Sequence, residues 1–514
     1  MTSPPPVSLK QLQLNTHRAP HKLSKSRFTA GKQCHKLLWW RVHEPLALEL
    51  QPDKVLQDRF DQGAQVGALA RRQFVGGVLI PLADRNDGSD RTWDERGDER
   101  LDITRQAIES GADTIFEGSF FADNTFVTCD VLLREPDGWR LIEVKAANSV
   151  KPEHLLDAAI QTHVLEGSGL KVAAMEIMHL NKECHFPDLT NLFERTVVTD
   201  EVRALLPDIH YEVEAQLTML RDPLPDVSIG LHCSEPFDCA FQERCWPKDP
   251  DHISNLYLIG RKTRCQENMD AGIHRISEIP ATKKLNFTAR RQIRAMKEQR
   301  LIVEPNLARA LEPFDVRLGF LDFETIVRAV PVWPGMNPWE QAAAQFSYHE
   351  ANRDGTYTHA EFLAEGPDDA RPLLTQRMIE ATSRAERIVT YSGFEKTRIR
   401  GLQEVVPALR AELIELEHKL IDLLPVLREH VYHPDFHGSF SIKSVLTPLV
   451  PELTYNDLVI VNGLVASVEI ARLLFVAGKI LPEEVPRVRM DLLEYCKRDT
   501  WAMVRLLDKL RALT

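Results

Sequence analysis

The chain has 514 residues, of which 43% are hydrophobic and 27% are charged, values ordinary for globular protein and sufficient for two or three domains. This composition excludes collagen-like and disordered chains, and nothing in it suggests a transmembrane segment. The net charge of -12 argues against a protein that coats polyanions in general, although clustered carboxylates can hold metal and local basic patches can meet phosphate.

The N-terminal segment, residues 1–27, carries basic side chains but no continuous apolar run. We therefore expect no secretory signal and a cytoplasmic protein. Eight cysteines in so large a cytoplasmic chain favour metal binding over disulfides wherever they cluster. Three of them cluster, at Cys233, Cys239 and Cys245, whereas Cys34 stands early and alone. The remaining four are expected to be plain core or surface residues: Cys129, Cys184, Cys265 and Cys496.

Residues 128–145, TCDVLLREPDGWRLIEVK, are typical of a β-hairpin, because two apolar runs flank the turn sequence EPDG. If Arg134 pairs with Trp139, Asp130 lies directly opposite Glu143 on one face of the sheet. Like charges in that position destabilise a sheet, so something must compensate for them.

A divalent cation shared by Asp130 and Glu143 would turn this repulsion into coordination. Lys145 lies two residues after Glu143, hence on the same face, where it would meet a substrate phosphate or an attacking water. The alternative is a chance acid-x-Lys pattern on the solvent face of an edge strand.

The spacing of these residues has the form of the PD-(D/E)XK nuclease motif. Two further polar residues lie nearby: one upstream in IFEGSFF, and one on a helix expected over 152–165. Together the set resembles the RecB-like branch of this superfamily: Glu117, Asp130, Glu143, Lys145 and Gln161. The resemblance implies that the acids hold magnesium and that the lysine stabilises charge developing on phosphorus.

The cysteines extend this resemblance. In the iron–sulfur members of the branch, one cysteine precedes the nuclease core and three follow it, as Cys34, Cys233, Cys239 and Cys245 do here. The resemblance implies a [4Fe-4S] cluster, and the two five-residue spacers suit it better than the tight knuckles of structural zinc. Zinc is the alternative, because ligand identity alone does not fix the metal.

One departure concerns the helix before the core, where many relatives carry a histidine metal ligand. The corresponding stretch, QGAQVGALARRQF, contains none. This departure favours a first domain that binds nucleic acid without cutting it.

A mainly helical connector follows, and its last part has a predicted basic face opposed by one acid, Glu298. The basic residues are Lys283, Lys284, Arg290, Arg291, Arg294, Lys297 and Arg300.

A new α/β pattern starts at the strand GFLDFET, in which Asp322 and Glu324 alternate and therefore share one face. A helix expected over 491–513 places Asp499 on an apolar stripe near Tyr495. A carboxylate in that place is costly unless it is neutralised or binds a cation. The alternative is an aspartate at the edge of the stripe that reaches solvent.

Asp322, Glu324, Tyr495 and Asp499 resemble the tyrosine-bearing DEDD exonucleases of the RNase H-like fold, in which four acids hold two divalent ions. The family expects a further acid in Asn-x-x-Phe-Asp, and YSGFE makes Glu395 that ligand here, with Asp422 as second choice. The resemblance also makes Tyr495 the residue that orients the attacking water. In HGSFSIKSVL, Lys443 is the expected phosphate contact.

The combination resembles a bacterial family of unassigned function that joins an iron–sulfur RecB-like nuclease domain to a DEDD-type exonuclease domain. We therefore predict an α/β protein with a PD-(D/E)XK domain over 22–246, a helical basic connector over 247–313 and an RNase H-like domain over 314–514.

The predicted activity is that of a magnesium- or manganese-dependent DNA nuclease with 3′-to-5′ exonuclease action, serving repair or defence against foreign DNA. The expected partner is nucleic acid, DNA before RNA, and no membrane. Two alternatives stay open: a nucleic-acid-binding protein in which one or both sites do not cut, and an RNA-directed 3′-to-5′ exonuclease.

Overall fold

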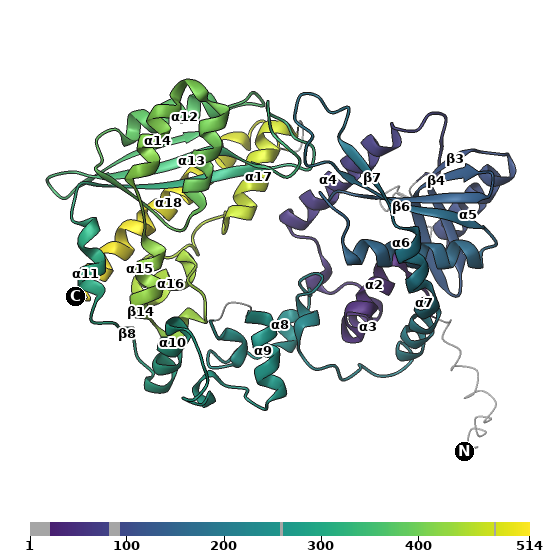
Figure 1. Cartoon of the computed structure of the whole chain (residues 1–514), viewed down its shortest axis with the longest axis horizontal. Coiled ribbons are helices and arrows are strands. Elements are labelled where there is room, and N and C mark those ends of the chain that lie inside the picture. The colour runs from purple at the N-terminus through teal and green to yellow at the C-terminus, as the bar shows by residue number, and fades with distance from the viewer. Residues whose placement is uncertain (1–20, 82–92, 258–260, 477–479) are drawn as a thin grey trace, which may run out of the picture. The chain divides into compact units, whose positions relative to one another are not determined.

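The computed structural model describes residues 21–81, 93–257, 261–476 and 480–514 (Figure 1). The protein is mixed α/β, as predicted, with two compact units. Unit 1 comprises Met1–Pro52, Phe60–Lys182 and Thr190–Cys245, and unit 2 comprises Asp53–Arg59, Glu183–Leu189 and Trp246–Thr514. Among the described helices, none combines the length and the apolar character needed to cross a membrane.

Unit 1 is built on a seven-stranded sheet in which β3, β4 and β5 form an antiparallel meander and β5 runs parallel to β6. The strands, in spatial order, are β2 (Val78–Leu79), β3 (Thr114–Ala122), β4 (Thr125–Glu135), β5 (Gly138–Lys145), β6 (Val172–Leu180) and β7 (Phe193–Val197), with β1 (Leu23–Ser24) pairing with β4.

The predicted hairpin register is confirmed, because Arg134 pairs with Trp139 and the ladder continues to Val131 and Ile142. The turn itself is shorter than expected, since Glu135 already pairs with Gly138. Gly138 has φ +144, and a Cβ there would lie 2.4 Å from the carbonyl oxygen of Lys171. Only glycine fits this position.

The main core of unit 1 lies between the sheet and α6, which begins at Pro152 as predicted and ends at Gly167. Leu141 and Ile177 of the sheet meet Ile160 of α6 in this core. The other helices are α2 (Lys25–Gln33), α3 (His35–His43), α4 (Lys54–Arg71, whose first turns belong to unit 2), α5 (Trp93–Glu109), α7 (Thr199–Met219) and α8 (Gln242–Cys245).

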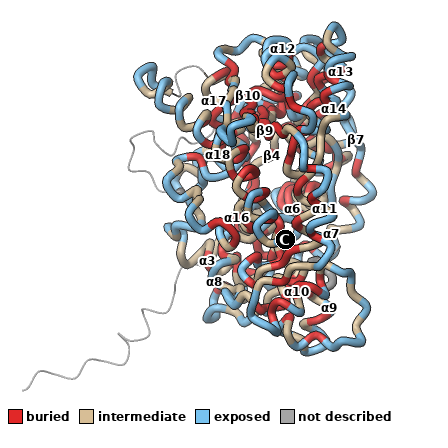
Figure 2. The backbone as a smooth tube through the Cα atoms, turned by 90° about the vertical axis from the view of Figure 1, so that its left-hand side faces the viewer, coloured by how far each residue is buried: buried red, intermediate tan, exposed pale blue. Residues whose placement is uncertain are grey.

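Unit 2 is built on a five-stranded mixed sheet in which β9 runs antiparallel to β10 and parallel to β12. Its strands, in spatial order, are β11 (Tyr357–Leu363), β10 (Gln341–Ala351), β9 (Leu318–Val327), β12 (Arg387–Thr390) and β13 (Leu420–Asp422). A separate pair joins β8 (Ile302–Val303) to β14 (Val431–Tyr432). Both β9 and β10 are largely buried, and they appear red in Figure 2.

Alternation along β9 assigns its side chains to two layers. Leu321 and Phe323 pack against α12 (Arg371–Thr382), α13 (Phe394–Val405) and α14 (Arg410–Lys419). Phe320 and Ile326 face the opposite way and pack with α17 (Gly463–Phe475) and α18 (Val485–Arg511). Asp322 and Glu324 therefore lie on the α17 and α18 side of the sheet.

The segment after Trp246 contributes α9 (Arg261–Asp270), α10 (Phe287–Glu298) and α11 (Leu307–Leu311), and α15 (Leu423–His430) and α16 (Ile442–Leu449) follow later. The basic face predicted here is only partly exposed. Arg291 is buried, donates to the carbonyl oxygen of Arg428 at 2.7 Å and pairs with Glu304 at 2.9 Å. The charge of Arg291 is therefore paired with Glu304, and this arginine holds α10 in place.

Candidate active sites

A cluster of three carboxylates lies inside unit 2. Asp322 and Glu324 come from β9 and Asp499 from α18, and their ligand oxygens all lie within 4.8 Å of one another. Burial, followed by repulsion from its neighbour Asp499, raises the pKa of Asp322 well above its usual range. Burial and the two aspartates do the same to the pKa of Glu324. Oxygen donors in such a group are the ligands that magnesium and manganese prefer.

Glu395, on the first turn of α13, completes this cluster. Its carboxyl group is hydrogen-bonded to Asp322, and burial raises its pKa well above the usual range. Its Oε2 is buried and has no hydrogen-bond partner within the described part of the chain. A buried carboxyl oxygen without a partner is costly, and a bound cation would satisfy it.

Asp422, the second choice for that ligand, is hydrogen-bonded to the backbone of two neighbouring segments. Its Oδ1 accepts hydrogen bonds from the backbone N–H groups of Ser392 at 2.8 Å and Leu424 at 2.9 Å. The first fixes the turn before α13, where Ser392 has a φ of +100°, and the second caps α15. This carboxylate positions the turn that carries Glu395.

Two tyrosines and a lysine border the cluster. Tyr495 is hydrogen-bonded to Asp499, and the Nζ of Lys443 donates to the Tyr495 hydroxyl at 3.1 Å. Tyr455 also donates to Asp499, a contact for which the sequence carries no spacing signal. Burial and the nearby acids raise the pKa of both tyrosines, so both hydroxyls keep their protons at neutral pH.

The N-terminus of α17 approaches the cluster closely. A Cβ at Gly463 would lie 3.4 Å from the Oε2 of Glu324, within van der Waals contact of that carboxylate. The positive end of the helix dipole therefore points toward the acids.

In unit 1, Glu143 is the most buried acid of the predicted site, with 1% exposure. It accepts hydrogen bonds from Lys145 at 2.8 Å, from Lys25 at 2.6 Å and from the Nε2 of Gln161 at 2.6 Å. Burial alone would raise the pKa of Glu143, but Lys145 and Lys25 bring it below the usual range. These lysines compensate for the two opposed carboxylates.

Lys25 was not predicted. It opens α2 in the sequence SKSR, and 118 residues separate it from Glu143, so no local pattern reveals the contact.

Asp130 lies beside this network. Its Oδ2 accepts a hydrogen bond from the backbone N–H of Val144 at 2.7 Å. Burial, followed by the charge of Glu143, raises the pKa of Asp130 to about 7.

Glu117 is paired with an arginine from the helix in which many relatives carry a histidine metal ligand. The Nη1 of Arg71, on α4, lies 3.0 Å from its carboxylate, and Glu117 itself has a φ of 56°. Within the described ranges, the oxygens of Glu117, Asp130 and Glu143 do not form a group with the 4.8 Å spacing seen in unit 2. In unit 1, basic side chains of the chain itself, Lys25, Lys145 and Arg71, pair with Glu143 and Glu117.

The four predicted cysteines converge, and none of them forms a disulfide. Cys34, Cys239 and Cys245 pack around the same small core as Trp40 and Phe241. Burial, together with the charges of the other three cysteines, raises the pKa of Cys239, so Cys233 belongs to the group as well.

The sulfurs of the described cysteines do not form a three-membered group as compact as the ligands of a zinc ion. Sulfurs around a tetrahedral zinc ion lie about 3.8 Å apart. Among the described residues, no three cysteine sulfurs lie within 4.8 Å of one another.

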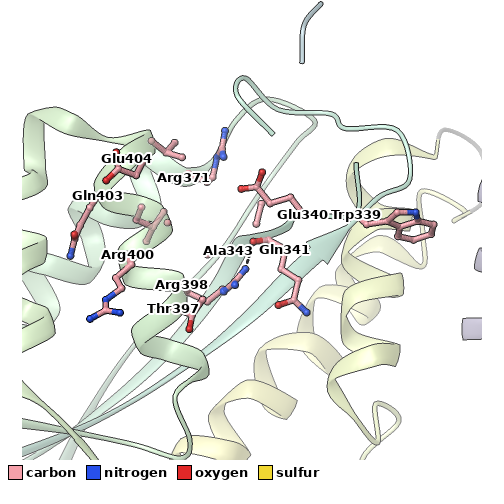
Figure 3. A pocket seen from close by; sticks show the side chains of 14 residues that line it. Trp339, Glu340, Gln341, Ala343, Arg371, Thr397, Arg398, Arg400, Gln403 and Glu404 are labelled. Atoms are coloured by element: carbon pink, nitrogen blue, oxygen red, sulfur yellow. Dashed lines mark hydrogen bonds between the residues drawn. The ribbon is translucent and has the colours of Figure 1, made fainter. Parts of the chain in front are cut away.

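A separate cavity of about 800 Å³ lies beside α13, between this helix and the start of β10 (Figure 3). Its polar lining includes Arg398, Arg400, Gln341 and Glu404, and Arg398 donates to the carbonyl oxygen of Gln341. None of the acids of either site lines it.

Comparison with known proteins finds a matching family and matching solved structures. Residues 319–441 match a family described as a domain of unknown function (DUF2779), and this segment includes Asp322, Glu324 and Glu395. A solved structure titled "Crystal structure of SSO0001" aligns over 46% of this chain and 91% of its own, with 8% identity and a TM-score of 0.22. A search of curated proteins returned no match.

Proposed function

We propose that the protein is a metal-dependent nuclease whose unit 2 hydrolyses phosphodiester bonds as a DEDD-type 3′-to-5′ exonuclease. The observation that carries the proposal is the buried cluster of Asp322, Glu324 and Asp499, completed by the unpartnered Oε2 of Glu395. Buried carboxylates with raised pKa values are typical of sites built to bind cations. A mixed five-stranded sheet with helices on both faces is compatible with the RNase H-like fold that the motifs suggest.

The side chains around the cluster have distinct tasks in this proposal. Magnesium or manganese ions held by the four acids would activate the water and stabilise the leaving 3′ oxygen. Tyr495 keeps its proton, so it orients the water as a hydrogen-bond donor and does not act as a base. Lys443, whose Nζ lies 4.7 Å from the centre of the Tyr495 ring, would meet the substrate phosphate.

For unit 1 we propose a RecB-like PD-(D/E)XK site. The element order α5, β3, β4, β5, α6, β6 supports it, as does the convergence of Lys145 and Gln161 on Glu143. The Oε1 of Gln161 is buried without a hydrogen-bond partner among the described residues. An acceptor therefore lies beside Glu143 that a ligand could satisfy.

A second candidate, nucleic-acid binding without cutting, applies to unit 1 alone. It is favoured by Arg71 against Glu117 and by Lys25 against Glu143, because these cations already neutralise the acids that a metal would need.

We further propose a [4Fe-4S] cluster on Cys34, Cys233, Cys239 and Cys245. Four free cysteines that lie near one another, one early in unit 1 and three at its end, fit a cluster that joins the two ends of this unit. The proposed substrate is DNA, in repair or in defence against foreign DNA, with RNA as the alternative polymer.

The test is digestion of end-labelled DNA and RNA by anaerobically purified protein, with magnesium, manganese or chelator. We expect metal-dependent shortening from the 3′ end that Asp322→Asn abolishes. In the Asp322→Asn background, Lys145→Ala and Glu143→Ala should remove any remaining cleavage. If that background binds DNA but does not cut it, unit 1 is a binding module. An inert parent in manganese would refute the nuclease proposal for unit 2.

A further inference from the structure

A second cluster of potential metal ligands lies in unit 1, apart from the acids and cysteines described above. It contains Asp123, His163 and His210, whose ligand atoms all lie within 4.8 Å of one another. The Nε2 of His163 is 2.9 Å and the Nδ1 of His210 is 3.7 Å from the same Oδ2 of Asp123. Ligand atoms around a tetrahedral zinc ion, at bonds of about 2.0–2.1 Å, lie about 3.3–3.4 Å apart. The three atoms are thus close to the positions such an ion requires.

The second nitrogen of His210 has an acidic neighbour of its own. Its Nε2 lies 3.5 Å from the Oε1 of Glu214, one turn further along α7. A carboxylate beside one ring nitrogen favours the proton on that nitrogen and leaves the lone pair on the other, and metal-binding histidines are commonly oriented in this way. In His210, that other nitrogen is the Nδ1 that faces Asp123 and His163.

The ligands are held in place by rigid elements. Asp123 belongs to the two-residue turn between β3 and β4, in which Asp123 and Asn124 both have positive φ. This turn lies tightly against the end of α6, because a Cβ at Gly167 would lie only 2.8 Å from the Cβ of Ala122. The buried neighbours of the histidines, Val164 on α6 and Ile209 on α7, belong to the main core.

We propose that Asp123, His163 and His210 bind a divalent transition-metal ion such as zinc, with Glu214 orienting His210. Imidazole and carboxylate ligands suit such an ion, and three protein ligands leave a fourth position for water. Asp123 and His210 are about half exposed, so the ion has a path to the site.

The ion would tie together three segments of unit 1. The carbonyl oxygen of Asn124, in the ligand turn, accepts a hydrogen bond from Leu23 at 2.9 Å, two residues before Lys25. α6 carries Gln161 two residues before His163. Metal binding here would therefore steady both of the elements that bring Lys25 and Gln161 to Glu143. The proposal is independent of the nuclease activity.

Zinc binding by the full chain tests the proposal. In a titration against a chromophoric chelator, the parent should bind one more zinc ion per chain than His163→Ala or His210→Ala. The cysteines and the acidic cluster are present in all three proteins, so the difference isolates this site. The exposed His185→Ala is the matched control and should behave as the parent.

The orienting carboxylate gives a graded readout. Glu214→Gln should weaken zinc binding about 10- to 100-fold, as loss of a partner to a ligating histidine does. Asp208→Asn, an exposed aspartate on the same helix, should change nothing. Crystals soaked in zinc should show an anomalous peak between Asp123 and the two histidines.

Equal zinc stoichiometry and affinity in the parent and in folded His210→Ala would overturn the proposal. So would anomalous peaks at other groups with none at this one.

Discussion

Asp499→Asn tests whether the acidic cluster of unit 2 is electrostatically strained when no metal is bound. At the 4.8 Å limit of the cluster, Coulomb's law with an effective dielectric constant of 20 gives about 3.5 kcal/mol for a fully ionised pair. The acids take up protons instead of all ionising, so we expect a net relief of about 1–2 kcal/mol. The asparagine oxygen still accepts from Tyr455, although the attraction to Lys443 is lost.

Thermal unfolding in chelator measures this relief. The midpoint of Asp499→Asn should rise by about 2–4 °C per kcal/mol. Asp491→Asn, on the same helix, should leave the midpoint unchanged. Manganese should stabilise the parent by mass action, about 2.7 kcal/mol at 100 times its dissociation constant, and should stabilise the variant much less.

The pH dependence has a defined sign. Raised carboxyl pKa values mean that the folded, metal-free protein binds more protons than the unfolded chain. Stability is therefore lost as the pH rises from the unfolded values of about 4 toward the raised folded values. This loss should be smaller in Asp499→Asn. A metal-free variant less stable than both the parent and Asp491→Asn would show that Asp499 is a structural acceptor for Tyr455, and the strain argument would fail.

The remaining predictions concern single side chains. Lys25→Met should lower the free energy of unfolding by about 1–3 kcal/mol in denaturant titrations, because Glu143 loses one of its hydrogen-bonded cations and keeps Lys145, and it should abolish any cleavage by unit 1. Asp422→Asn should change stability little, because asparagine caps a helix as well as aspartate does, and should retain exonuclease activity, whereas Glu395→Gln should lose that activity in the same assay. Tyr495→Phe should slow trimming without stopping it, measured as single-turnover rates, since only an orienting hydroxyl is removed. Cys239→Ala should remove the broad visible absorbance of an iron–sulfur cluster and lower the midpoint of unit 1, and a parent that holds zinc and no iron would contradict this.

Local periodicity was enough to predict several features from the sequence. The β-hairpin register follows from turn chemistry and strand alternation, and the shared face of Asp322 and Glu324 follows from the two-residue period of β9. The one-turn spacing of Tyr495 and Asp499 likewise follows from the helical period of α18. Such features depend on neighbours within a few residues, which the sequence displays directly.

Contacts between distant segments were decided by tertiary packing alone. Lys25 reaches Glu143 across 118 positions, and Tyr455 reaches Asp499 across 44. Asp123 meets His163 only because the close approach of Gly167 to Ala122 sets α6 against the turn between β3 and β4. No periodicity marks such partners, since which side chains meet depends on how helices and sheet pack around a common core. The sequence therefore predicted that Asp322, Glu324 and Asp499 share one region, and the packing determined which cations and hydroxyls surround the acids of each unit.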